Sequence, residues 1–96
     1  MSERIFFHNP ALNRYELQVD GQVAVAEYTI KEDGIVRITH VGVPKALEGQ
    51  GLASQLTLAA LEDIKKQGKF VFPVCPFVKT YILRHPEWNP LVKQPE

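Results

Sequence analysis

The chain has 96 residues, of which 45% are hydrophobic and 23% are charged, a composition typical of a globular protein. Lysine and arginine together number 11, as do aspartate and glutamate, so the formal net charge is zero. This balance argues against nucleic acid or an anionic membrane as a partner. The length predicts one domain over residues 1–96, and a single cysteine excludes an internal disulfide and favours a cytoplasmic location.

The first half of the chain predicts an antiparallel meander of strands separated by turn signals. The expected strands are residues 4–7, 14–19, 22–30 and 35–43. The second and third of these alternate polar and apolar residues. Asp20 and Gly21 lie between them, and this dipeptide is a strong signal for a tight hairpin.

The second half predicts a strand–helix–strand unit. Apolar residues recur at helical spacing over 52–66, and Gly68 suits the left-handed residue that ends a helix. Residues 69–75 have the composition of a buried strand, which should run parallel to the 35–43 strand because a helix connects the two. Residues 77–85 predict a short final helix.

The expected fold class is therefore α/β (α+β), with an antiparallel meander joined to one parallel βαβ unit and a short C-terminal helix. Residues 88–92 are expected to pack back on the core, and residues 93–96 to form a loose tail.

A glycine-rich loop connects the expected 35–43 strand to the expected helix. Its two glycines allow a tight turn, and the first turn of a helix offers free N–H donors to a phosphate or pyrophosphate. A glycine pair at such a junction can also serve only as a turn. The loop residues are Glu48, Gly49, Gln50, Gly51, Leu52 and Ala53.

Ligands of open α/β sheets bind at the carboxyl ends of parallel strands. That rule places Val41, Gly42 and Val43 in one crevice with the glycine loop and Cys75. Cys75 ends a strand just before a helix, where a helix dipole can favour a nucleophilic thiolate. The alternative is that Cys75 is a small buried apolar residue.

His40 is the candidate base, because imidazole exchanges a proton near neutral pH. The strand pleat predicts that it shares a face with Val36 and Ile38. A hydrogen-bonded structural histidine is the alternative role. Tyr81 could protonate a leaving thiolate, or could simply pack in the core. The three histidines lack any short metal-ligand spacing, so no metal site is expected.

Three segments carry a resemblance to a known family: Gly49–Ala53, Cys75–Val78 and Tyr81–Trp88. Together they resemble the GNAT superfamily of acyl-CoA-dependent N-acyltransferases, from about residue 14 to residue 92. Within it, the chain is similar to the small single-domain subfamily of bacterial YjdJ-like proteins and N-acetyltransferase domain-containing proteins of animals.

The resemblance implies acetyl transfer from acetyl-CoA to an amine acceptor whose identity is open. It implies that backbone groups of Val41 and Val43 align the pantetheine arm and that the glycine loop binds the pyrophosphate. It also implies that Cys75 approaches the cofactor's sulfur, as an acyl-cysteine intermediate would require, with His40 as the nearby proton acceptor.

Two departures from the superfamily pattern support an alternative function, that of a non-catalytic acyl-CoA-binding or sensing module. Glu48 stands where the superfamily usually carries Gln or Arg, and its carboxylate repels a pyrophosphate. The sequence also lacks the helical insertion and final strands that usually wall the acceptor site, so we expect an open acceptor site or one completed by another subunit.

Overall fold

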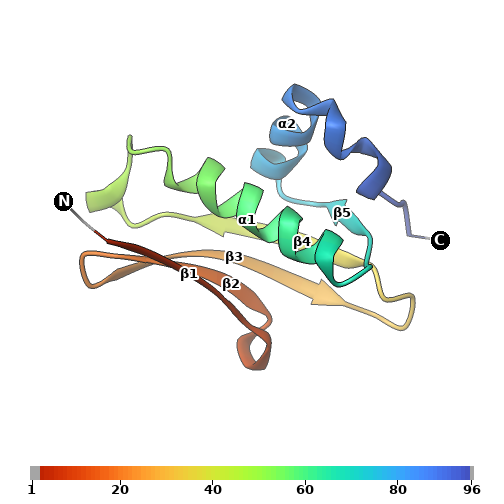
Figure 1. The fold of residues 1–96 in the computed structure, drawn as a ribbon, viewed down its shortest axis with the longest axis horizontal. Helices are drawn as coiled ribbons and strands as arrows, with labels where there is room; N and C mark the ends of the chain where they lie inside the picture. Colours follow the sequence, from red (N-terminus) through yellow and green to blue (C-terminus); the bar gives the residue numbers. More distant parts are fainter. Residues whose placement is uncertain (1–2, 96) are drawn as a thin grey trace.

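The structure is a computed structural model that describes residues 3–95, and its core is one five-stranded sheet (Figure 1). The strand order is β1-β2-β3-β4-β5, antiparallel except that β4 and β5 are parallel. The predicted α/β fold class is confirmed. The strands are β1 (Arg4–Asn9), β2 (Arg14–Val19), β3 (Gln22–Ile30), β4 (Val36–Gly42) and β5 (Val71–Pro73), and the α-helices are α1 (Leu52–Lys66) and α2 (Pro76–Arg84).

Both α-helices pack on one side of the sheet. Helix α1 lies along the strands (Figure 1) and contacts β2, β3 and β4, because its apolar face carries Leu52, Leu56 and Ile64 at helical spacing. Val78 and Ile82 of α2 join the same buried cluster. Among residues 3–95, no helix is both long and apolar enough to cross a membrane.

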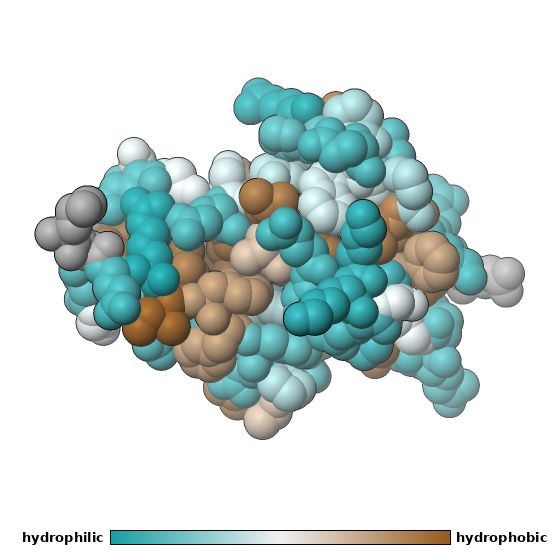
Figure 2. All heavy atoms as spheres, in the orientation of Figure 1, coloured by the Kyte–Doolittle hydropathy of each residue, from teal (hydrophilic) through white to brown (hydrophobic). Residues whose placement is uncertain are grey.

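The other side of the sheet, which we call the open face, is formed by the outward residues of β1 to β4. Neither α1 nor α2 covers this side (Figure 1). The register aligns its residues in rows across the strands, one of which joins Ile5, Gln18 and Val23. Hydrophobic side chains also reach the surface over β1 (Figure 2), where Ile5 is 47% exposed and Phe7 is 36% exposed.

Strand β4 contains a β-bulge that the sequence did not predict. Tyr28 pairs with Ile38, but the preceding residue Glu27 pairs with His40, so Thr39 is the extra residue. The Thr39 hydroxyl donates a hydrogen bond of 3.3 Å to the Glu27 carbonyl. An extra residue turns the following side chains to the other face. The expectation that His40 shares a face with Ile38 is therefore wrong.

The predicted strand over residues 69–75 is also too long. Only Val71–Pro73 pair with β4, opposite Val36–Ile38. Phe70 and Val74, on either side, are 44% and 46% exposed. An apolar run therefore does not mark a buried strand throughout its length.

The last described segment returns to the core after a 3₁₀ helix over Pro86–Leu91. Trp88, Leu91 and Val92 pack against the buried cluster, as expected. The Lys93 amide donates a hydrogen bond of 3.0 Å to the Val71 carbonyl, which ties the start of the predicted tail to β5. Glu96, the last residue of that tail, lies outside the described residues.

Candidate functional site

Strands β4 and β5 separate at Ile38. The carbonyl oxygen of Ile38 accepts hydrogen bonds from both the Val74 amide (3.0 Å) and the Cys75 amide (2.9 Å). Among the described residues, no strand pairs with β4 on this side beyond Ile38. The edge of β4 from His40 to Gly42 therefore faces an opening between the two strands, where backbone groups can pair with an extended ligand.

The glycine loop lies at the far end of this edge. Gly49 and Gly51 adopt left-handed conformations with φ of +83° and +73°. A Cβ built on either would meet nothing within 4 Å, so glycine is required there by backbone conformation and not by lack of space. The loop thus brings the chain tightly into the start of α1.

Gly51 is the N-cap of α1, and its carbonyl accepts the first intrahelical hydrogen bond, from the Gln55 amide at 3.0 Å. The amides from Leu52 to Ser54 precede that bond and have no intrahelical acceptor. In the described part of the chain, no side chain caps this helix end. These amides and the helix dipole form an anion-binding arrangement.

The loop is anchored on both sides. Leu47 and Leu52 are buried in the core cluster. Arg4 at the start of β1 donates to the Gln55 side chain (2.5 Å) and, more weakly, to the Gln50 carbonyl (3.4 Å). Glu48 is exposed and extended, so its carboxylate stands in solvent beside the loop.

Cys75 lies just before α2, as the sequence predicts, but it does not end the strand, because β5 stops at Pro73. It is the N-cap of α2, and its carbonyl accepts a hydrogen bond of 3.0 Å from the Lys79 amide. Its side chain is only 6% exposed and belongs to the core cluster. His40 is exposed on the open face. The structure therefore places the candidate nucleophile and the candidate base on opposite sides of β4.

Tyr81 lies on the helix side of the opening. Its ring packs against the His85 ring, with a centroid distance of 4.3 Å and the two planes tilted by 32°. Burial, and to a lesser degree the charges of Glu87 and Glu62, raise the pKa of Tyr81. A phenol that resists ionisation can act only as a proton donor near neutral pH. It lines a small hollow of about 90 Å³ between the helices, whose lining residues are Ser54, Phe77, Thr80, Tyr81, Arg84 and His85.

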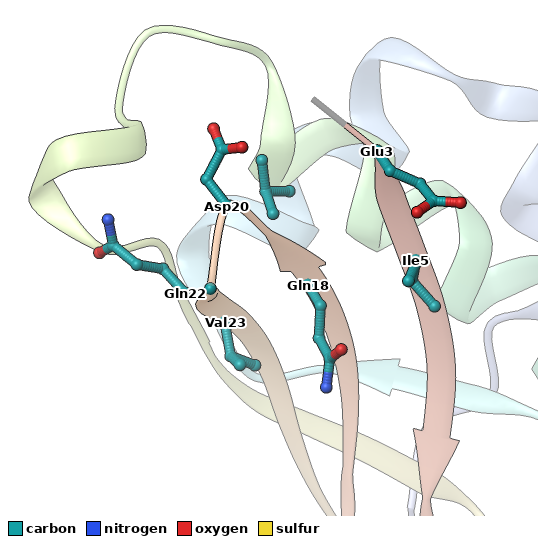
Figure 3. Close-up of a pocket in the computed structure, with 8 residues that line it drawn as sticks. Glu3, Ile5, Gln18, Asp20, Gln22 and Val23 are labelled. Atoms are coloured by element: carbon teal, nitrogen blue, oxygen red, sulfur yellow. The ribbon is translucent and has the colours of Figure 1, made fainter. Parts of the chain in front are cut away.

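A hollow of about 410 Å³ lies on the open face (Figure 3), next to the Asp20–Gly21 hairpin, and was not predicted from the sequence. The row Ile5, Gln18 and Val23 forms part of its wall, together with Glu3. Neither the β4 edge nor the glycine loop contributes to it. Residues 18–23 of the hairpin line it together with Glu3 and Ile5, which the pairing of β1 with β2 brings beside them.

The sequence also missed a polar cluster between the sheet and the end of α1. The Tyr15 hydroxyl donates a hydrogen bond of 2.8 Å to Asp63, and the His8 Nε2 atom lies 2.5 Å from the Tyr28 hydroxyl. Burial is the main cause that raises the pKa of both tyrosines, and Asp63 adds to it. This cluster joins three strands to α1, and its role is structural.

The family is shown by comparison with known proteins. A model of the GCN5-related N-acetyl-transferases matches residues 14–91. The chain belongs to this family. The finer likeness to YjdJ-like proteins remains a prediction.

A solved structure of another protein has a similar fold. The solution structure of a GCN5-like protein from Staphylococcus aureus superposes with a TM-score of 0.72. The alignment covers 96% of this chain and 90% of that one, at 20% sequence identity. At this sequence identity, the similarity is evidence for a shared fold. Acetyl transfer, in general terms, is the activity of the GCN5-related family.

Proposed function

We propose that the chain binds acetyl-CoA in the opening between β4 and β5 and transfers its acetyl group to an amine. The observation that carries this proposal is the shared hydrogen-bond acceptor, the Ile38 carbonyl, at which β5 leaves β4. Beyond it, the free edge of β4 suits the amide-bearing pantetheine arm as an added strand.

The cofactor's two ends fit the two ends of this edge. Pantetheine would pair with backbone groups of Val41, Gly42 and Val43. The pyrophosphate would accept hydrogen bonds from the amides of the glycine loop, Glu48–Ala53, at the positive end of the α1 dipole. The thioester would then lie near the bulge, between His40 and Cys75.

In the direct route, the amine nitrogen attacks the thioester carbon. The C–N bond forms, the C–S bond breaks and CoA leaves as a thiolate that takes up a proton. His40 accepts a proton from the amine. A backbone N–H of the β4 edge stabilises the oxyanion of the tetrahedral intermediate. The exposure of His40 on the open face favours this route, since an acceptor can reach it from solvent.

The second candidate is a covalent route through Cys75. Its sulfur would attack the thioester carbon, form acetyl-cysteine and release CoA, and the amine would then take the acetyl group and restore the thiol. The N-cap position of Cys75 beside Ile38 favours this route. Its burial and its separation from His40 disfavour it.

Release of free CoA thiol from acetyl-CoA, measured with a panel of primary amines, tests the proposal. In the direct route, His40→Gln should lower kcat by about 10² or more, while Cys75→Ala keeps most of the activity. In the covalent route, Cys75→Ala should abolish activity, and mass spectrometry should find one acetyl group on Cys75. If acetyl-CoA binds but no amine releases thiol, the chain is a non-catalytic acyl-CoA-binding module and transfer is disproved.

A further inference from the structure

The His40 ring lies along β4 and covers Gly42, two residues further along the strand. The Nε2 atom is 2.8 Å from the position that a Cβ on Gly42 would occupy. That separation is shorter than a side-chain carbon tolerates, so any other residue at position 42 must displace the ring. The backbone of Gly42 does not itself require glycine, because it lacks the left-handed φ of the loop glycines. The absence of a side chain at position 42 therefore leaves room for the His40 ring.

This arrangement directs the imidazole along the free edge of β4. The bulge at Thr39 turns His40 to the open face, and Gly42 lets the ring run toward the glycine loop. The ring tip thus lies beside the stretch of β4 that has no strand partner on its β5 side. On the helix side of the sheet, Cys75 and Val78 belong to the buried core cluster. The exposed open face is the side from which a second substrate can reach His40.

A carboxylate faces this position from the neighbouring strand. Glu27 on β3 is the cross-strand partner of His40, and both side chains are exposed. The next residue in the row is Arg14, whose guanidinium already pairs with Glu16 at 2.8 Å. No ion pair within residues 3–95 involves Glu27. Its negative charge is therefore available to a cation on the open face.

We propose that Glu27 attracts, and Gly42 helps to position the base for, the acceptor amine of the proposed function, which reaches the thioester from the open face beside His40. Glu27 attracts the ammonium group and His40 takes one proton from it, which then passes to solvent. The second proton lost by the nitrogen leaves with the CoA thiol. The absence of a side chain at Gly42 positions the His40 ring, while the Gly42 backbone remains free to pair with pantetheine. This proposal rests on the binding of acetyl-CoA along β4.

Two CoA thioethers of the same shape test the charge preference without a known acceptor. S-(2-aminoethyl)-CoA carries an ammonium group where S-propyl-CoA carries a methyl group. By calorimetry, the aminoethyl compound should bind about twofold to fivefold more tightly, as expected for an exposed charge pair. Glu27→Gln should remove this preference. The matched control Glu62→Gln, on α1 across the sheet, should keep it.

NMR tests the place of the acceptor and the role of Gly42. The aminoethyl protons should show NOEs to Gly42 and His40, and NOEs to Phe77 or Tyr81 instead would overturn the proposal. Gly42→Ala should shift the His40 ring signals and lower kcat by about tenfold to a hundredfold, with acetyl-CoA affinity within about twofold. In the His40→Ala background, Gly42→Ala should have no further effect on kcat.

The outcomes separate this inference from the proposed function. Equal binding of the two thioethers, or unchanged His40 signals in Gly42→Ala, overturns the inference while acetyl-CoA binding stands. If acetyl-CoA and both thioethers fail to bind, the proposed function itself is wrong.

Discussion

The amide of Cys75 donates a 2.9 Å hydrogen bond to the carbonyl oxygen of Ile38, which ties the start of α2 to the last β4 residue that pairs with β5. This bond fixes the point at which the two parallel strands separate. The free edge of β4 begins there and leads to the glycine loop at the start of α1. One hydrogen bond thus relates the candidate nucleophile, the opening between the strands and the proposed path of the cofactor.

The glycine loop should be needed for both folding and binding. Gly51→Ala should lower the free energy of unfolding by about 1–2 kcal/mol, because alanine is strained at φ +73°. It should also weaken acetyl-CoA binding about tenfold or more, as loss of a hydrogen bond to a charged group predicts. Urea denaturation and calorimetry measure the two effects.

Gly68→Ala is the matched control for that variant. Gly68 has a similar φ of +71° and open space around it, but it lies at the other end of α1. Its substitution should cost similar stability and leave acetyl-CoA affinity unchanged. Equal losses of affinity in both variants would contradict a specific role for the loop.

Glu48 should oppose cofactor binding. Its exposed carboxylate stands beside the proposed pyrophosphate site, so Glu48→Gln should tighten acetyl-CoA binding about twofold to fivefold at low salt. The gain should shrink as ionic strength rises, because salt screens exposed charges. Calorimetry at two salt concentrations measures it. A gain that does not change with salt would exclude this electrostatic explanation.

Tyr15 should make stability fall at alkaline pH. Burial, followed by its hydrogen bond to Asp63, raises the pKa of Tyr15 well above the ordinary value near 10. The folded protein therefore keeps the proton that the unfolded chain loses above about pH 10, and stability declines as pH rises beyond that point. Below about pH 10, the contribution of Tyr15 to the free energy of unfolding is fully present.

Tyr15→Phe should lower the free energy of unfolding by about 1 kcal/mol at neutral pH, through the lost hydrogen bond. It should also make the decline above pH 10 shallower, since one raised pKa is removed. Urea denaturation from pH 7 to 11 measures both. Parallel pH profiles for the two proteins would disprove this role for Tyr15.

Local patterns predicted some elements closely. The limits of α1, Leu52–Lys66, match the predicted helix because the helical spacing lies within the segment and Gly68 follows it closely. The strands β2 and β3 follow from alternation and the Asp20–Gly21 hairpin. The glycine loop and the Cys75 segment indicated the family, and the family match over residues 14–91 confirmed it.

Features set by tertiary contacts were not predictable. The bulge at Thr39 depends on how β4 registers against β3, and no turn residue marks it in the sequence. It reversed the face expected for His40 and separated it from Cys75. The Tyr15–Asp63 bond joins residues 48 apart in the chain. Such pairs depend on the assembled fold and have no local signature.

Titration of the isotope-labelled protein with acetyl-CoA, followed by amide NMR, tests the central claim most directly. The account predicts that the largest shifts fall on the Gly49–Ala53 amides and on Val41–Val43, with smaller changes elsewhere. Absence of shifts at both segments at saturating cofactor, or shifts confined to the hollow beside the Asp20–Gly21 hairpin, would contradict it.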